Sequence, residues 1–371
     1  MDFDKERFLK EVEYLVNIDS GTGTPEGISQ IADFLKQKYE NAGFDVKLRT
    51  FDPAYGTCVE ARNYPEDEEI DLLLIGHMDT VFPKGTAAQR PFRIEGDCAF
   101  GPGVADMKSG LLLGAELAEH LIKSRPELRI CIANNCDEEI GSSSTKAWLT
   151  KLASKSKYCL DFEPGRSDGS FVKTRKGVQR LLIKIQGVTA HAGVNPKDGV
   201  SAILEMSNWV CHFAEDGVLE QGTTVNFGVV NGGTVYNMIP GYAEADVDIR
   251  FDKEEQLDKV MQEFYRLEKN PFSDKVQVTI EKLGKTVPMI TNESSINLMG
   301  LMEQEGAKLG QKVAFVGTGG GSDASNASSA GAATMDACGP VGFKAHNEGE
   351  YILIYTIEER FQLMVNVCKY I

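Results

Sequence analysis

The pattern of apolar residues is clearest at 71–75, where the residues from Leu72 to Ile75 follow one another without a polar interruption. Such a run is typical of a strand that is buried on both faces of a parallel sheet. Further strands are predicted at 44–50, 57–62 and 128–133 and in a run that ends at residue 161. Segments with helical spacing of apolar residues accompany them, at 4–17, 26–42, 111–123 and 142–152. Strands that alternate with helices predict an α/β fold, with a sheet flanked by helices.

The pattern changes between residues 168 and 285. Long strands are predicted at 177–187, 223–230, 243–251 and 275–283, and helices at 199–215 and 253–268. Antiparallel strands with two helices on one face predict a ferredoxin-like α+β domain. The α/β pattern resumes with a helix at 293–309. We therefore predict one α/β domain made of residues 1–167 and 286–371, with a second domain inserted at 168–285.

A histidine and an aspartate follow the apolar strand at 71–75. Open α/β sheets bind their ligands at the carboxyl ends of the strands, where His77 and Asp79 lie. Side chains two residues apart point the same way along an extended chain, so His77 can face a metal ion while Asp79 binds its other ring nitrogen. The alternative is an ordinary polar turn, and this pair alone does not decide between the two.

Other predicted strand ends and loops carry further candidate ligands. Asp106 lies in a glycine-rich loop that leads into a helix, and Glu138 and Glu139 follow a predicted strand. Glu163 follows the next strand, and His346 lies in a loop. Carboxylates mixed with imidazoles, without thiols, suit zinc, cobalt or manganese. Two histidines and three carboxylates exceed what one tetrahedral zinc ion needs, and they fit two metal ions bridged by a carboxylate.

Each of these side chains also has an ordinary explanation. Asp106 can cap a helix, and the two adjacent glutamates can stabilise a helix start through its dipole. Glu163 can lie in a solvated turn, and His346 can be a surface histidine. The metal-centre hypothesis is favoured because all of them fall at strand ends or loops of one predicted sheet. Adjacent side chains diverge, so one of Glu138 and Glu139 can bind metal while the other holds a proton.

Composition narrows the function classes. The chain has 371 residues, of which 42% are hydrophobic and 25% charged, so it can form two domains with a large core. A net charge of −16 argues against a nucleic-acid partner. No apolar run approaches the ~18 residues of a membrane span, and the first residues do not resemble a signal peptide. The eight cysteines show no Cys-x-x-Cys spacing, which indicates reduced thiols, and we expect a cytoplasmic protein.

Five motifs, in order along the chain, resemble those of the co-catalytic zinc peptidases. They are Gly-His-Met-Asp-Thr-Val at 76–81, Gly-Pro-Gly-Val-Ala-Asp-Met-Lys-Ser-Gly at 101–110, Asp-Glu-Glu-Ile-Gly-Ser at 137–142, Phe-Glu-Pro at 162–164, and the segment from Gly-Pro to Ala-His at 339–346. This family includes glutamate carboxypeptidase, acetylornithine deacetylase, succinyl-diaminopimelate desuccinylase, aminoacylase and peptidase T. The chain looks most similar to bacterial glutamate carboxypeptidase. The resemblance spans essentially the whole chain and implies a zinc-exopeptidase-like catalytic domain.

The resemblance also implies a role for each candidate residue. His77 and Glu163 would bind one zinc ion, while Glu139 and His346 would bind the other. Asp106 would bridge both ions, and cobalt or manganese could replace zinc. Asp79 would orient His77. Glu138 would be the general base that takes a proton from the attacking water and passes it to the leaving amine.

By the same resemblance, the inserted domain would be a lid and a dimerisation domain, so we expect a homodimer. His191, in a Gly-Val-Thr-Ala-His-Ala-Gly motif, would reach the neighbouring subunit's active site and stabilise the oxyanion. Asn237 and Arg250 look like lid residues that contact the substrate. The alternatives are a surface histidine and an exposed arginine without a partner. Backbone N–H groups could bind a substrate carboxylate in a glycine-rich loop that is otherwise only flexible, at Gly319, Gly320 and Gly321.

These expectations give a cytosolic two-zinc exopeptidase or amidase, similar to glutamate carboxypeptidase. Its substrate would be a small peptide or an acyl amino acid. One alternative is an N-acyl amino acid deacylase, similar to acetylornithine deacetylase, or a di- or tripeptidase. An alternative of another class is a metal-dependent binding protein without turnover, which the retained Glu138 and the full ligand set argue against. The metal motifs do not define the substrate pocket, so the sequence leaves the side-chain preference open.

Overall fold

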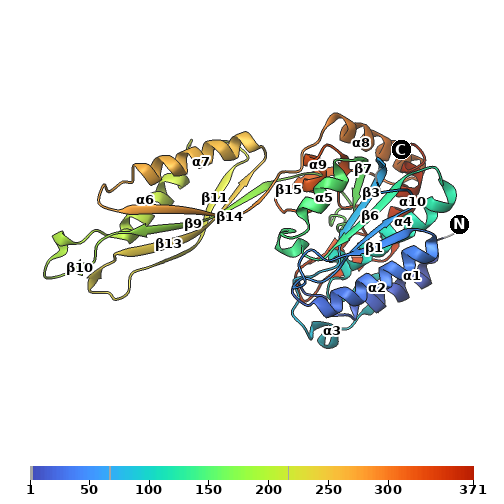
Figure 1. Ribbon diagram of the computed structural model, residues 1–371, viewed down its shortest axis with the longest axis horizontal. Coiled ribbons are helices and arrows are strands. Elements are labelled where there is room, and N and C mark those ends of the chain that lie inside the picture. Colours follow the sequence, from blue (N-terminus) through green and yellow to red (C-terminus); the bar gives the residue numbers. More distant parts are fainter. Residues whose placement is uncertain (1–2, 67, 216) are drawn as a thin grey trace. The chain divides into compact units, whose positions relative to one another are not determined.

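The computed structural model describes residues 3–66, 68–215 and 217–371, and the chain divides into two compact units (Figure 1). Unit 1 contains the chain up to Thr174, together with Met289–Thr318 and Ser322–Ile371. Unit 2 contains Arg175–Pro288 and Gly319–Gly321. The chain thus leaves unit 1 after Thr174 and returns after Pro288, a few residues later than the sequence led us to expect.

A six-stranded sheet forms the centre of unit 1, in the order β1-β2-β6-β3-β7-β16. The strands are β1 Asp45–Arg49, β2 Cys58–Arg62, β3 Ile70–His77, β6 Ile130–Asn135, β7 Ser156–Asp161 and β16 Ala333–Met335. The leucine-rich β3 pairs in parallel with β6 and β7 and is buried almost throughout. The first two strands are antiparallel, and β16 pairs in parallel with β7. The predicted α/β fold is confirmed, with the apolar strand at the middle of the sheet.

Helices cover both faces of this sheet (Figure 1). They are α1 Lys5–Val16, α2 Pro25–Ala42, α3 Thr86–Gln89, α4 Ser109–Ser124, α5 Lys146–Ala153, α8 Glu293–Lys308, α9 Ala324–Ser329 and α10 Tyr355–Val367. The most apolar of the long ones, α4, is buried along most of its length, whereas α1 and α2 bury one stripe. Helix α2 starts with proline in its first turn and ends at Gly43 with a positive φ of 102°, as helix termini commonly do.

A second, smaller sheet in unit 1 was not predicted. Its four short antiparallel strands lie in the order β17-β18-β5-β4 and comprise β4 Arg93–Glu95, β5 Cys98–Phe100, β17 Gly342–Phe343 and β18 Tyr351–Leu353. A further strand pair joins β8 Phe171–Arg175 to β15 Phe315–Thr318. Two short helical turns follow β5 and β6, at Val104–Lys108 and Glu138–Ile140. The small sheet places the loop after β5 beside the loop between β17 and β18.

Unit 2 is built on a four-stranded antiparallel sheet with the order β11-β13-β9-β14. In chain order its elements are β9 Gly177–Gln186, α6 Ala202–Ala214, β11 Thr224–Gly232, β13 Tyr242–Phe251, α7 Glu254–Lys269 and β14 Gln277–Thr286, with a small pair formed by β10 Ala190–His191 and β12 Met238–Ile239. Apolar residues of the two helices and of the sheet form a separate core. This is the predicted β-α-β-β-α-β arrangement. Its role as a lid and dimerisation domain stays a prediction.

The helix expected at 142–152 begins only at Lys146. The preceding residues form a turn instead, because Asp137 accepts hydrogen bonds from Ser144 N at 2.7 Å and from Thr145 Oγ1 at 2.5 Å. Serine and threonine hydroxyls commonly compete with a helical backbone in this way. Within the described ranges, no helix has the length and apolar character needed to cross a membrane.

Candidate metal centre

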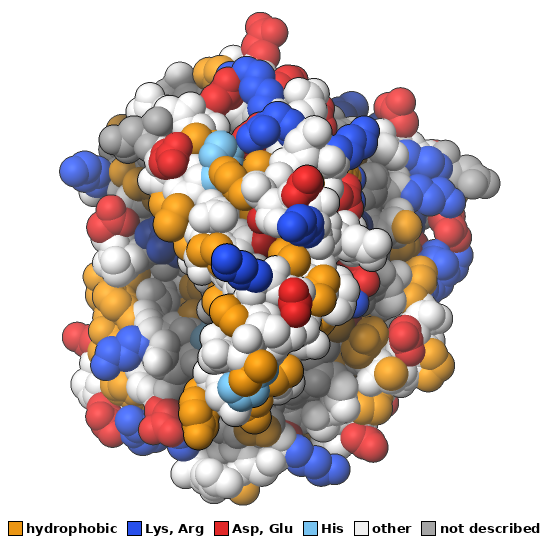
Figure 2. Space-filling view, turned by 90° about the vertical axis from the view of Figure 1, so that its left-hand side faces the viewer, with side chains coloured by type: hydrophobic (Ala, Val, Ile, Leu, Met, Phe, Trp, Pro, Cys, Tyr) orange, Lys and Arg blue, Asp and Glu red, His pale blue; other side chains and the backbone are white. Residues whose placement is uncertain are grey.

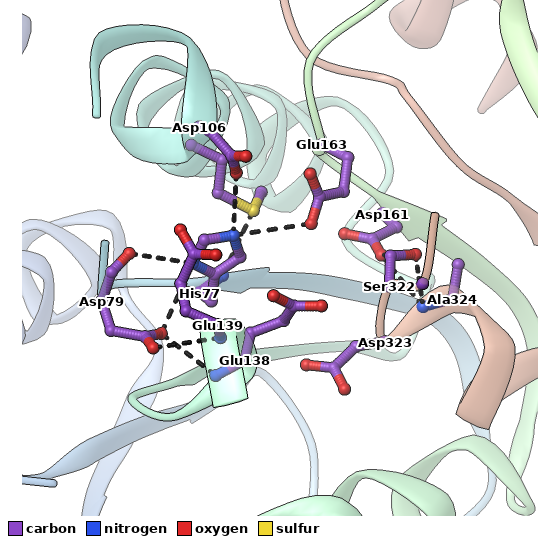
Figure 3. A network of polar contacts seen from close by, with 12 residues as sticks. His77, Asp79, Asp106, Glu138, Glu139, Asp161, Glu163, Ser322, Asp323 and Ala324 are labelled. Carbon is purple, nitrogen blue, oxygen red and sulfur yellow. Dashed lines mark hydrogen bonds and ion pairs between the residues drawn. The ribbon is translucent and has the colours of Figure 1, made fainter. Parts of the chain in front are cut away.

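The site is centred on His77, the last residue of β3, whose side chain is 2% exposed. Its Nε2 atom lies 3.0 Å from Asp106 Oδ1 and 3.5 Å from Glu163 Oε1 (Figure 3). Asp106 comes from the helical turn after β5, and Glu163 follows β7, which neighbours β3 in the sheet. The parallel pairing of β3 and β7 places the ends of both strands at the same edge of the sheet.

Asp106 lies between two histidines. Its Oδ1 atom contacts His77, while its Oδ2 atom lies 3.1 Å from Nε2 of His346. The same His346 nitrogen lies 3.2 Å from Glu139 Oε2. His346 has a positive φ of 64° in the loop between β17 and β18, and its side chain is 50% exposed. The two oxygens of one carboxylate therefore face two separate sets of side chains, as a bridging ligand requires.

Asp79 contacts the His77 ring more closely through its backbone oxygen than through its carboxylate. His77 Nδ1 lies 3.0 Å from the backbone oxygen of Asp79 and 3.4 Å from its Oδ1 atom. A carbonyl oxygen can only accept, so Nδ1 carries the hydrogen and Nε2 is directed at the candidate ligands. The Asp79 carboxylate accepts from Glu138 N at 3.1 Å, from Glu139 N at 3.2 Å and from Thr22 Oγ1 at 2.7 Å. It thus fixes the backbone of the two glutamates as well as contacting the ring.

Glu138 stands beside the first set of candidate ligands. Its carboxylate, Glu163 and His77 offer ligand atoms that all lie within 4.8 Å of one another. Burial raises the pKa of Glu138 well above its usual range, and the negative charges of Glu163 and Asp323 add to this effect against the opposing influence of His77. A carboxylate with a raised pKa can accept a proton and give it up again, which suits a general base.

The site concentrates negative charge in a partly buried place. Burial opposes ionisation of Asp106, yet hydrogen bonds from His346 and His77 hold the pKa of this carboxyl well below its usual range. Hydrogen bonds to Asp106 and Glu139 raise the pKa of His346 to about 11. Burial counteracts, but does not cancel, the carboxylates that raise the pKa of His77 well above normal. Buried charges of this kind are found paired or bound to metal ions, and a bound cation would displace these protons.

The donor set fits divalent metal ions. It combines imidazole nitrogens with carboxylate oxygens, and one of those oxygens, Glu139 Oε1, is buried without a hydrogen-bond partner among the described residues. His77, Asp106 and Glu139 also offer ligand atoms that lie within 4.8 Å of one another. An unpaired buried carboxylate oxygen is costly unless a cation binds it. Zinc, cobalt and manganese accept such mixed nitrogen and oxygen ligands.

Sequence reasoning missed Asp323, which lies at the end of the glycine-rich loop and is 6% exposed. Its carboxylate accepts from Asn135 Nδ2 and from Ser142 Oγ, both at 2.6 Å. Asn135 ends β6, directly before the segment that carries Glu138. Asp323 therefore supports that segment from the side opposite Asp79 (Figure 3). The sequence offers one signal for this residue, the glycine-rich run at 317–323 that ends in Asp323.

The remaining candidate residues belong to unit 2. His191 is exposed, and its Nδ1 atom accepts from Gly193 N and Val194 N, both at 3.1 Å. Asn237 is also exposed, and its backbone oxygen accepts from Ala192 N at 2.9 Å. The expected contacts of both side chains with substrate stay predictions.

Arg250 is not the unpartnered arginine of the alternative interpretation. It binds both oxygens of Asp248, with Nε at 2.6 Å and Nη2 at 3.0 Å. Its Nη1 atom donates to the Gly319 oxygen at 3.1 Å, and Arg175 Nη1 donates to the oxygens of Gly320 at 3.3 Å and Gly321 at 3.0 Å. The carbonyl groups of this loop thus face two arginines. Carboxylate binding by its N–H groups stays a prediction.

Comparison with known proteins places these observations in a family. The chain is 31% identical over 368 residues to Carboxypeptidase G2 of Pseudomonas sp. (strain RS-16), which covers 96% of this chain and 87% of that protein. It is 27% identical over 263 residues to acetylornithine deacetylase of Vibrio campbellii, covering 66% of this chain and 68% of the relative. The crystal structure of aminopeptidase PepT from Bacillus cereus has the same fold, with a TM-score of 0.81, 23% identity and 98% of both chains covered.

Residues 73–370 match the model of peptidase family M20/M25/M40, which begins within β3 and includes every candidate metal ligand from His77 to His346. The match confirms the resemblance found in the sequence motifs. This protein belongs to peptidase family M20/M25/M40 and is a metallo-hydrolase of the peptidase or amidohydrolase type.

Proposed function

We propose that the protein is a two-metal hydrolase that cleaves a C-terminal or N-acyl amide bond of a small peptide or an acyl amino acid, in the manner of a glutamate carboxypeptidase. The observation that carries the proposal is the position of Asp106. Its two carboxylate oxygens lie 3.0 Å and 3.1 Å from the Nε2 atoms of His77 and His346. One carboxylate shared by two ligand sets is the arrangement that a pair of metal ions needs.

In this proposal the ligands divide into two sets that share Asp106. His77 and Glu163 would hold one zinc ion, and His346 and Glu139 would hold the other; cobalt or manganese could take their place. When bound, the two ions supply Lewis acidity, which polarises the scissile carbonyl and makes water easier to deprotonate. The ring hydrogen bond from His77 Nδ1 to the Asp79 backbone oxygen leaves Nε2 facing Asp106 and Glu163, where it would be free to bind the first ion.

Glu138 moves the proton. Its carboxylate takes a proton from the attacking water, whose oxygen forms a bond to the carbonyl carbon. The same proton then goes to the amide nitrogen as the carbon–nitrogen bond breaks, and a carboxylic acid and an amine are the products. The raised pKa of Glu138 supports this role, and the backbone hydrogen bond from Glu138 N to Asp79 keeps the residue in position.

The residues of unit 2 complete the proposal. Arg250 and the loop at Gly319, Gly320 and Gly321 would bind the terminal carboxylate of the substrate, and Asn237 would contact the substrate as well. Arginine is well suited to a two-point grip on a carboxylate, and the substrate carboxylate would have to replace Asp248, which Arg250 holds in this way in the structure. His191 would stabilise the oxyanion in the active site of the neighbouring subunit.

A homodimer through unit 2 is part of the same proposal. Strand β11 is an edge of its sheet, with Val229 and Val230 both 48% exposed, and α6 exposes Leu204 at 62%. Hydrophobic side chains lie among charged ones on the surface of unit 2 near β10 (Figure 2). Exposed apolar residues along an edge strand and a helix favour association with a second copy. Sedimentation should give a dimer that Leu204→Asp dissociates and Leu283→Asp, on the opposite edge strand, leaves intact; a monomeric wild type would contradict this part.

We also propose a cytoplasmic location. All eight cysteines are free thiols in the structure, as expected for a protein kept in a reducing compartment. Fractionation of the source cells would test this, and recovery of the protein outside the cytoplasm would contradict it.

The experiment that tests the activity is a substrate panel with defined metals. Metal-free protein is reloaded with zinc, cobalt or manganese and assayed on peptides with C-terminal glutamate, on acyl-glutamate conjugates and on other dipeptides. We expect hydrolysis of a C-terminal glutamate bond, and the 31% identity to Carboxypeptidase G2 over 96% of the chain supports this choice. Two bound ions with no hydrolysis of any amide would contradict the proposal and favour a binding protein.

A second candidate is an N-acyl amino acid deacylase. The 27% identity to acetylornithine deacetylase over 263 residues favours it. Adding N-acetyl amino acids, including N-acetylornithine, to the same panel separates the two candidates. A preference of kcat/KM for the N-acetyl compounds over the glutamyl substrates would favour the deacylase.

A further inference from the structure

A buried carboxylate outside the ligand set, Glu350, lies against the backbone that carries Asp106. Its side chain is 1% exposed. Its Oε1 atom accepts hydrogen bonds from Ala105 N at 2.8 Å and from Asp106 N at 2.9 Å, and its Oε2 atom accepts from Gly103 N at 3.0 Å. All three donors are backbone N–H groups of one short loop.

This loop needs such an acceptor. Gly103 has a positive φ of 73°, and Asp106 has φ −115° and ψ 94°. Because these angles are not helical, the backbone does not supply the carbonyl acceptors that a regular helix would. Buried N–H groups that lack an acceptor are costly, and the two oxygens of one side chain here accept from three of them. The position of the Asp106 backbone therefore depends on Glu350.

Glu350 also belongs to the segment that carries His346. Both residues lie between β17 and β18, and Glu350 immediately precedes Tyr351, which pairs with Phe100 in β5. Aromatic contacts stabilise this segment, since the centroid of the Tyr351 ring lies 5.1 Å from the ring centroid of Phe100 and 4.8 Å from that of Phe343. A single side chain thus ties the loop of Asp106 to the loop of His346.

We propose that Glu350 is a positioning residue that holds Asp106 in its place between His77 and His346. It acts through the backbone of Asp106 and contacts no metal ligand atom. The Asp106 carboxylate faces both histidines at 3.0–3.1 Å, so a shift of about 1 Å removes one of the two contacts. The inference rests on the proposed two-metal centre. Loss of Glu350 should weaken binding of the second ion most, because that ion needs both Asp106 and His346.

The test is a metal titration of the full chain. Metal-free wild type, Glu350→Gln and Glu350→Asp are titrated with Co²⁺ alone, followed by calorimetry and by visible absorption. The amide of Gln has only one acceptor oxygen, and Asp is one methylene shorter, so neither can serve all three N–H groups. We expect wild type to bind two ions, and each variant to bind the second about 10–100-fold more weakly, the usual effect of losing an outer hydrogen-bond partner.

Glu205 offers a matched control in unit 2. It is also 1% exposed, and it accepts from Phe272 N at 2.8 Å, Ser273 N at 2.9 Å and Trp209 Nε1 at 2.9 Å. Glu205→Gln should lower the unfolding temperature of the metal-free chain, as Glu350→Gln does, but keep wild-type Co²⁺ binding. Amide hydrogen exchange at Gly103, Ala105 and Asp106 should accelerate only in the Glu350 variants.

The outcomes separate this inference from the proposed function. Wild type that binds fewer than two Co²⁺ ions would overturn both. Wild type that binds two ions, with equal affinities in the Glu350 variants, would overturn only the role of Glu350. An equal loss of affinity in Glu205→Gln would also overturn it, because the loss would then follow from general destabilisation. If Glu350→Gln does not fold, Glu350→Asp decides the matter alone.

Discussion

Glu60 gives the sharpest test of the forces that hold unit 1 together. Its side chain, in β2, is 1% exposed, and its carboxylate accepts from Arg49 Nη2 at 2.9 Å, from Arg62 Nε at 2.9 Å and from Trp148 Nε1 at 2.7 Å. Glu60→Gln removes the charge but keeps the shape. Arg62, whose side chain is only 8% exposed, then loses its ion pair with Glu60, while Arg49 keeps its ion pair with Glu66.

The size of the effect follows from this burial. Removing one partner of a buried ion pair typically costs about 3–5 kcal/mol. We expect the lower end, about 3 kcal/mol, because Arg49 is 29% exposed and recovers contact with water. For a unit of this size, each kcal/mol lowers the unfolding temperature by about 2–4 °C, so Glu60→Gln should lower it by about 6–12 °C.

The same network contains its own control. Glu66 pairs with Lys47 and with Arg49, but its side chain is 48% exposed. Glu66→Gln should cost less than about 1 kcal/mol, because exposed ion pairs contribute little. Both variants are compared with wild type by calorimetry and urea unfolding at pH 7. Equal losses in the two variants would refute the argument that burial sets the size of the effect.

The pH dependence provides a second check. Burial alone would raise the pKa of Glu60, but the hydrogen bonds from Arg49 and Trp148 and the charge of Arg62 bring it below the usual value. A carboxyl whose folded pKa is lowered stabilises the protein above its unfolded pKa of about 4.3, and this contribution disappears as the pH falls through the folded value. The difference between wild type and Glu60→Gln should therefore be constant near neutrality and shrink below about pH 4. A difference that stays unchanged down to pH 3 would contradict the assigned ionisation.

Three further predictions concern activity. Glu138→Ala should keep both metal ions by elemental analysis and lose about 10²–10⁴ in kcat, because proton transfer from water is lost; an active variant would contradict the general-base role. Removal of metal by a chelator should abolish hydrolysis and lower the unfolding temperature, and readdition at about 100 times Kd should restore about 2.7 kcal/mol of stability; a chelated protein of unchanged activity would argue against the metal centre. Arg250→Lys should raise KM about tenfold or more for substrates with a free carboxylate and leave kcat nearly unchanged, because lysine cannot reproduce the two-point grip; an unchanged KM would remove Arg250 from the substrate site.

The long elements could be predicted from the sequence because each has its own periodic pattern. The run at 71–75 is β3 in the middle of the sheet, and the alternating strands at 177–187 and 243–251 are β9 and β13. The small sheet could not be predicted, since strands of two or three residues such as β17 and β18 carry no period. Its pairing exists only because two segments about 250 residues apart come together, as Tyr351 and Phe100 do.

The candidate site shows the same division. Residues at strand ends, such as His77 and Glu163, could be proposed as ligands because a parallel sheet places those ends at one edge. Asp323 and Glu350 could not, because their hydrogen-bond partners lie far away in the sequence and come close only in the folded chain. Asp323 accepts from Asn135 and Ser142, and Glu350 accepts from backbone N–H groups. A carboxylate that serves a distant loop has no local signature.

The order of the ligands along the chain has a consequence for the timing of assembly. Asp106 and Glu163 are translated soon after His77, whereas His346, the remaining contact of Asp106, follows only after the whole of unit 2 has been made. Four of the five candidate ligands, namely His77, Asp106, Glu139 and Glu163, are therefore made before the inserted segment, and only His346 comes after it. The side chains of Asp106 and Glu139 would remain without their shared histidine contact until the segment that returns from unit 2 brings His346 to them.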